Sequence, residues 1–175
     1  MLSDEQVWEA YNALMLNGPL DEVEPATEEE IGNLGRMIAM HNVVGFNYDG
    51  LVWKYDQARK GKEFNLETVN RVAQFLKTID RLFDQSPFSY TKWRSSYGLK
   101  HDMEFLRMRF GDESQYVSNG EFMAGYFHYL TVDVAMEPSS VRAKIKPEID
   151  GGLNLFMKVS TAYQKIADIA RNRGF

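Results

Sequence analysis

The sequence contains no cysteine. It can therefore form no disulfide, no thiolate metal site and no cysteine nucleophile. A chain without disulfides suits a reducing compartment. We therefore expect the protein in the cytoplasm, either that of its own cell or that of a host cell.

Long apolar runs are also missing. No segment approaches the roughly eighteen uninterrupted apolar residues of a membrane-spanning helix. The first residues, MLSDEQVWEAYNALML, lack the basic start and the unbroken apolar run of a secretory signal. We expect this segment to be a helix of the mature fold, and we expect no membrane partner.

The recognised short motifs of catalytic and cofactor sites are absent as well. The sequence has no H-x3-H, no H-E-x-x-H, no E-x-x-H and no aspartate-rich calcium loop. It also has no glycine-rich phosphate loop and no G-x-S-x-G nucleophile motif. The sequence therefore predicts no metal and no cofactor, and it favours a protein that is not an enzyme.

What is present describes an ordinary folding chain. Hydrophobic residues make up 44% and charged residues 26% of the 175 residues, as in soluble globular proteins. There are eleven Phe, nine Tyr and three Trp, whereas disordered chains are poor in aromatic residues. The length predicts one domain over residues 1–175.

The net charge of -5 is unevenly distributed. Residues 1–35 contain nine acids and no Lys or Arg, so residues 36–175 hold sixteen acids against all twenty bases, a balance of +4. This asymmetry indicates an acidic N-terminal region beside a mildly basic body. A simpler interpretation is that acids gather at helix N-termini, where the helix dipole favours them.

Apolar residues recur at spacings of three and four along most of the chain, which is typical of helices with one buried face. The pattern predicts helices over about 4–16, from 27 to the glycines at 45–50, at 51–55, over 66–84, from 91 or 97 to 110, over 121–136 and over 153–172. We therefore predict an all-α fold, a compact single-domain bundle of about six to eight helices.

Two kinds of local signal refine this prediction. Thr27 with Glu30, and Ser118 with Glu121, have the spacing of a capping box, so we assign both glutamates structural roles. Segment 139–152 is ambiguous, because Ser139 or Ser140 can cap a short helix while Val141, Ala143 and Ile145 alternate as in a strand. We expect it to be irregular, with a short helix or a short extended segment.

A basic and aromatic zone lies in the middle of the chain. Residues 71–109 contain eight bases and four acids. On the predicted 66–84 helix the bases lie opposite the apolar stripe, and pairing of that helix with the next one would join them into one patch. The predicted anion-binding or nucleic-acid-binding residues are Arg71, Lys77, Arg81, Lys92, Trp93, Arg94, Tyr97, Lys100 and Arg107.

This zone leads to the main functional hypothesis. Arginine binds phosphate through two parallel hydrogen bonds, and Trp93 and Tyr97 can stack on the bases of a single strand. We expect a non-catalytic binding or assembly module whose partner is an anionic macromolecule, either nucleic acid or an acidic protein surface. The plainer interpretation is a solvated helix exterior, with Lys100 and Glu104 as an ordinary i,i+4 pair.

Two alternatives from other classes remain. The acidic N-terminal region can dock on the basic zone, either within one chain or between copies of a self-assembling protein. Alternatively the protein is a small helical enzyme with a histidine acid or base. His41 and His128 lie in apolar patterns that predict core positions, so His101 is the best of the three candidates.

Overall fold

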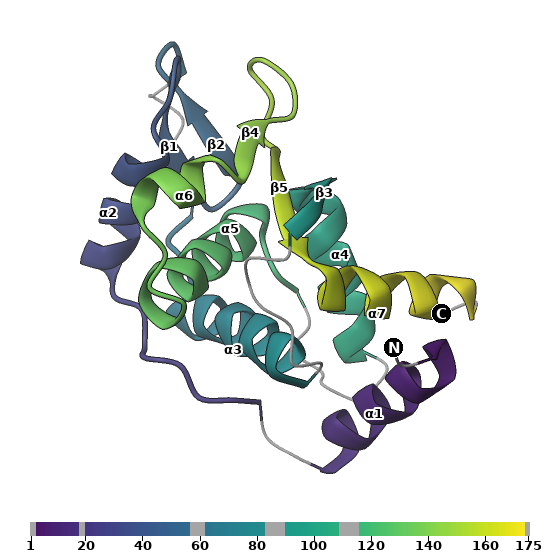
Figure 1. The fold of residues 1–175 in the computed structure, drawn as a ribbon. Helices are drawn as coiled ribbons and strands as arrows, with labels where there is room; N and C mark the ends of the chain where they lie inside the picture. Colours follow the sequence, from purple (N-terminus) through teal and green to yellow (C-terminus); the bar gives the residue numbers. More distant parts are fainter. Residues whose placement is uncertain (1–2, 18–19, 57–61, 83–89, 109–115, 174–175) are drawn as a thin grey trace.

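The computed structural model describes residues 3–17, 20–56, 62–82, 90–108 and 116–173 (Figure 1). Within these ranges it is mixed α/β, although helix predominates. The helices are α1 Asp4–Asn17, α2 Glu28–Ile38, α3 Leu66–Leu82, α4 Ser96–Met108, α5 Asn119–His128, the π-helix η1 Tyr129–Asp133, α6 Pro138–Arg142 and α7 Thr161–Asn172. The strands are β1 Val43–Asn47, β2 Gly50–Trp53, β3 Tyr90–Ser95, β4 Ile145–Pro147 and β5 Leu155–Ser160. The predicted all-α bundle is therefore wrong.

Helix α5 lies at the centre of the fold (Figure 1). All its residues are buried, and it packs against α2, α3, α4 and β2. At Gly125 the approach to α3 is so close that a Cβ atom would lie 2.5 Å from Val72. The aromatic stretch of α5 thus forms the core, as its apolar circumference indicates.

Segment 43–53 is a β-hairpin, where the pattern predicted the end of the second helix and a short helix at 51–55. Strands β1 and β2 pair antiparallel, with Asn47 opposite Gly50 across the turn. Gly50 has a φ of +138°, which a side chain would strain. Because α2 already ends at Ile38, His41 lies exposed in a turn with a φ of +51°, and its predicted core position is wrong.

Segment 153–172 divides into a strand and a helix, where one helix was predicted. Leu155, Met157 and Val159 alternate into the core along β5, and Ser160 then caps α7 by accepting a hydrogen bond from the Tyr163 amide at 3.2 Å. Strand β5 pairs antiparallel with β3 on one side and with β4 on the other. The ambiguous 139–152 segment contains both of its alternatives, helix α6 and strand β4.

The predicted helix N-termini at 27–30 and 118–121 are confirmed. Thr27 accepts from the Glu30 amide at 3.2 Å, and Ser118 and Glu121 form a complete capping box. On the side of the molecule away from the β1–β2 hairpin, α1 packs against α7 (Figure 1). In the described part of the chain, no helix has the length and apolar character needed to cross a membrane.

Candidate ligand site formed by tyrosines and a buried lysine

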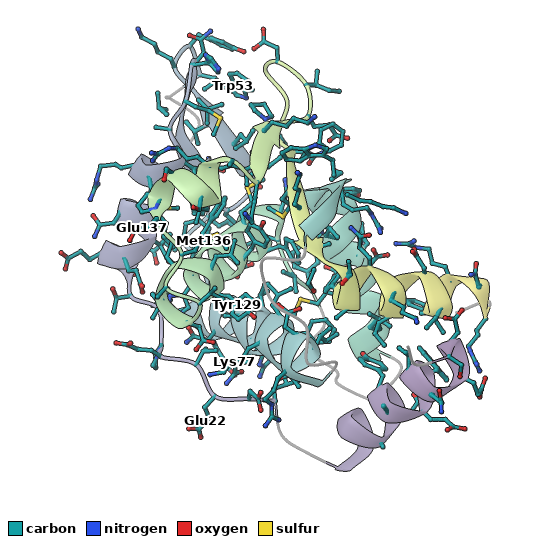
Figure 2. All side chains as sticks on the ribbon, viewed as in Figure 1. Glu22, Trp53, Lys77, Tyr129, Met136 and Glu137 are labelled. Carbon is teal, nitrogen blue, oxygen red and sulfur yellow. The ribbon has the colours of Figure 1, made fainter. Side chains whose placement is uncertain are left out.

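The predicted basic face of α3 is occupied by ion pairs within the chain. Arg71 pairs with Glu67 at 2.6 Å, and Arg81 pairs with Asp21 at 2.6 Å. Lys77 lies beside the linker between α1 and α2 (Figure 2), where it donates to the Glu22 carbonyl at 2.9 Å. Its ammonium also lies 2.9 Å from an Asp133 carboxylate oxygen. These three bases are therefore engaged internally, two of them by the acidic N-terminal region of the same chain.

The remaining predicted site residues separate into different environments. Arg94 of β3 pairs with Asp102 of α4 at 2.7 Å and so joins these two elements. Arg171 of α7 binds the same carboxylate at 2.6 Å. Lys92 lies on the side of the sheet next to α7. The side chain of Arg107 lies outside the described residues. Two residues of the predicted set, Tyr97 and Lys100, line one pocket together.

This pocket has a volume of about 400 Å³ and is open to solvent. Four segments that are distant in sequence contribute to it: the β1–β2 turn, the first turns of α4, the start of α5 and the residues before β5. The residues that line it, called the tyrosine pocket below, are Tyr48, Asp49, Tyr97, Lys100, Tyr116, Ser118, Asn119, Leu153 and Asn154.

Two glycines allow these segments to meet. The Gly120 amide donates to the Tyr48 carbonyl at 2.9 Å, and a Cβ atom on Gly120 would lie 1.7 Å from the carbonyl oxygen of Asn47. A Cβ atom on Gly50 would lie 2.2 Å from the Leu153 carbonyl oxygen. Side chains at either position would separate the hairpin from α5 or from the loop before β5, so both glycines are needed to form the pocket wall.

Lys100 is the charged centre of the tyrosine pocket. Its residue is only 4% exposed, which is rare for lysine. The ammonium donates to the Val117 carbonyl at 2.9 Å and lies 3.4 Å from Glu104 Oε1. Its nitrogen is also 5.3 Å from the ring centroid of Tyr97 and 4.9 Å from that of Tyr116. Because an ammonium has three N–H groups, one has no acceptor among the described residues.

Glu104 supports this arrangement from behind. One carboxylate oxygen accepts from the Val117 amide at 2.8 Å, and the other lies 2.8 Å from His101 Nδ1. The His101 ring in turn packs edge-on against Tyr97, with the centroids 4.4 Å apart. Lys100, His101 and Glu104 thus form one network that holds the Tyr97 wall of the pocket.

Another part of the pocket wall contains the buried side-chain amide of Asn119. The two N–H groups of the Asn119 side chain lie within hydrogen-bond distance of three oxygens, which are the carbonyls of Asp49 at 3.4 Å and Leu153 at 3.1 Å and the Asn154 side chain at 3.0 Å. Three oxygen acceptors determine which end of the amide is the nitrogen. Asn119 Oδ1 is consequently buried without a donor from the described residues.

Tyr48 completes the wall on the hairpin side. Burial raises the pKa of its phenol, and the negative charge of Glu121 raises it further. A hydrogen bond with Tyr116 acts in the same direction. Tyr48 therefore keeps its proton at neutral pH and presents a hydroxyl group that can both donate and accept.

Sequence reasoning missed most of this pocket. Tyr48, Tyr116, Asn119 and Asn154 were not among the predicted site residues. Two signals were available, because SYGLKH and YVSNGEF each place a tyrosine beside polar residues at the start of a helix. Their proximity, however, depends on how α4 and α5 pack, which the sequence does not state.

Comparison of the chain with protein-family models, with curated proteins and with solved structures gave no match. No cluster of three His, Asp or Glu side chains that could hold a metal ion occurs in residues 3–173 where the structure describes them. The functional assignment is therefore built on the geometry of the tyrosine pocket.

Proposed function

We propose that this protein binds a nucleotide in the tyrosine pocket. In this arrangement the base packs among Tyr48, Tyr97 and Tyr116, and an anionic oxygen of the ligand takes the remaining N–H of Lys100. The observation that carries the proposal is the buried Lys100, whose ammonium lies near the rings of both Tyr97 and Tyr116 in the wall of an open pocket.

The size and chemistry of the pocket support a ligand of this class. A volume of about 400 Å³ lies in the range of small-molecule sites, which are about 300–1,000 Å³. Stacking of a base on an aromatic side chain contributes about 1–3 kcal/mol. A charge-assisted hydrogen bond from an ammonium to a phosphate oxygen is about twice as strong as a neutral one.

The buried amide adds a polar feature that a base can use. An acceptor without a donor, such as Asn119 Oδ1, costs about 1–3 kcal/mol when it is buried. An amino group of a base, or a water molecule that the ligand orders, can supply this donor once the Asn119 side chain turns its oxygen toward the pocket. Ligand entry then stabilises the wall that Asn119 builds between the hairpin and the loop before β5.

The test measures binding of the four ribonucleoside monophosphates by isothermal titration calorimetry. Lys100→Met keeps the length of the side chain but removes the charge, and we expect it to weaken binding at least tenfold. Tyr116→Ala should cause a similar loss without unfolding, because Tyr116 is 67% exposed. Lys92→Met is the matched control, since it removes a lysine from another side of the sheet.

The result that contradicts the proposal is equally definite. Circular dichroism first establishes that each variant is folded. If no monophosphate binds the unchanged protein, or if Lys100→Met and Tyr116→Ala both bind as the unchanged protein does, the tyrosine pocket is not a nucleotide site.

One observation favours acid–base catalysis as a second candidate function. His101 is held by Glu104 at 2.8 Å, and a histidine oriented by a carboxylate is typical of catalytic groups. Its side chain is 48% exposed, so a ligand in solution can contact the imidazole ring. Incubation with single-stranded oligonucleotides and mass spectrometry of the products tests this candidate. Cleavage that His101→Ala abolishes supports it, whereas intact oligonucleotides exclude it.

A further inference from the structure

The outward face of the three-stranded sheet carries two lysines that have no ion pair with a carboxylate among the described residues. Leu155, Met157 and Val159 of β5 point into the core, so Phe156 and Lys158 lie on the other face. Strand pairing places Trp93 of β3 opposite Lys158, and Lys146 of β4 opposite Phe156. These four residues, Trp93, Lys146, Phe156 and Lys158, are called the sheet surface below.

Both lysines of the sheet surface lie against the same aromatic ring. The Lys146 nitrogen is 4.4 Å and the Lys158 nitrogen 4.9 Å from the ring centroid of Trp93. Lys146 is also 5.7 Å from the Phe156 centroid. The indole remains 36% exposed, so a ligand can reach it. Cation–π attraction holds the two ammonium groups near the ring although they repel each other.

Neither lysine pairs with a carboxylate in the described part of the chain. This distinguishes them from Arg71, Lys77 and Arg81 of α3, each of which has an acidic partner. Because the two ammonium groups lie near one ring without an acidic partner among the described residues, an anion that contacts both would relieve their repulsion. The nearby acid Glu148 is hydrogen-bonded by the Ser95 hydroxyl at 3.2 Å.

The geometry points to single-stranded nucleic acid as the partner of the sheet surface. A base stacks on Trp93, and the backbone phosphates contact Lys146 and Lys158. An acidic peptide would use the two charges but not the exposed indole. A duplex would offer phosphates but keeps its base faces stacked inside. A single strand uses both features of this surface.

This inference extends the proposed function from a nucleotide to a strand, but it rests on different residues from those of the tyrosine pocket. The two surfaces are close in the chain, because Tyr97 follows Trp93 by four residues and Asn154 precedes Phe156 by two. Because the two surfaces share no residue, each proposal is tested with its own variants, and either can fail while the other holds.

The experiment measures fluorescence anisotropy of labelled twelve-nucleotide single strands between about 50 and 300 mM salt. The double variant Lys146→Ala/Lys158→Ala should weaken binding at least tenfold at about 100 mM salt. It should also reduce the slope of log affinity against log salt by about 1.4, since each phosphate contact on a single strand contributes about 0.7. Trp93→Leu, which keeps apolar cover over the strands, should weaken binding about tenfold with an unchanged slope.

The control removes the same charge from another side of the molecule. Lys92 and Lys165 line a shallow hollow beside α7, and Lys92→Ala/Lys165→Ala should change affinity less than threefold. Monophosphate binding should survive in Lys146→Ala/Lys158→Ala if the tyrosine pocket is a separate site. Strand binding that Lys146→Ala/Lys158→Ala does not weaken overturns the inference, as does its absence at about 50 mM salt. Equal competition by a twelve-residue polyglutamate overturns it in favour of an acidic protein partner.

Discussion

The charge of Asp80 should set part of the pH dependence of stability. Asp80 lies in α3 and is only 5% exposed. Burial raises the pKa of its carboxyl group from 3.8 to about 6, although hydrogen bonds from Ser160 and from Tyr129, the latter at 2.8 Å, act in the opposite direction. The two donors come from different elements, Ser160 from the end of β5 and Tyr129 from η1.

The size of the effect follows from this shift. A pKa difference of one unit corresponds to about 1.4 kcal/mol, so a rise of about two units corresponds to at most about 3 kcal/mol. The folded state holds the proton more tightly than the unfolded state. Asp80 therefore contributes stability fully below about pH 3.8, and this contribution is lost as the pH rises through about 6. At pH 7.5 the buried carboxylate destabilises the fold.

The variant Asp80→Asn isolates this contribution, because an amide oxygen can still accept from Tyr129 but cannot ionise. Between pH 4.5 and pH 7.5 we expect the stability of the variant to rise by about 2 kcal/mol relative to that of the unchanged protein, because part of the full contribution of about 3 kcal/mol is already lost at pH 4.5. Urea unfolding followed by circular dichroism gives both free energies, and other titrating groups cancel in the comparison. Asp168→Asn, at an exposed position, should show no such change with pH.

The result that refutes this reasoning is a difference between Asp80→Asn and the unchanged protein that is the same at both pH values. A constant loss would mean that the amide fails to replace the hydrogen bonds and that the carboxyl group does not titrate in this range. Tyr129→Phe offers a second check. It removes a hydrogen bond that lowers the pKa of Asp80 in the folded state, so the loss of stability should continue to a higher pH than in the unchanged protein.

Two further substitutions test contacts that organise the candidate site. Gly120→Ala should destabilise the fold by about 1–3 kcal/mol in urea unfolding and abolish ligand binding, because its methyl group would collide with the Asn47 carbonyl. Unchanged stability would refute the close approach of Gly120 to the Asn47 carbonyl. Asp102→Asn removes the charge that Arg94 and Arg171 share, and we expect it to lower the free energy of unfolding by about 1–3 kcal/mol. High salt should reduce this difference, because it screens the ion pairs of the unchanged protein. Equal stability of the two proteins at low salt would contradict a stabilising role.

Several local features were predictable because their signals lie within a few residues of each other. The start of α2 at Thr27 and the start of α5 at Ser118 follow from capping residues three positions apart. Helix α3 follows from an apolar stripe that tertiary packing does not contradict. The burial of α5 follows from an apolar surface that covers most of its circumference.

Only part of the candidate site was predictable from the sequence, and the residues predicted correctly lie in a different kind of surface from the one expected. Tyr97 and Lys100 were predicted as members of an exposed basic patch, whereas Lys100 is buried in the wall of a pocket. Its partner carbonyl at Val117 is seventeen residues away, and Tyr48 comes from the hairpin. Such contacts depend on the packing of α4, α5 and the β1–β2 turn.

By itself, the sequence determined a cysteine-free chain, most helix positions and the helix caps, because each depends on composition or on neighbours within one or two helical turns. Only the tertiary structure decided that β5 is a strand, since a spacing of four from Leu155 to Val159 fits a helix face and an alternating strand equally well. It also decided which charges remain available. Arg171 contacts Asp102, sixty-nine residues away, and Lys77 contacts Glu22, fifty-five residues away. Lys146 and Lys158 lie against the same Trp93 ring because β3, β4 and β5 pair. Side chains so distant along the chain are brought together by the burial of apolar surface, which is non-directional and acts over the whole fold.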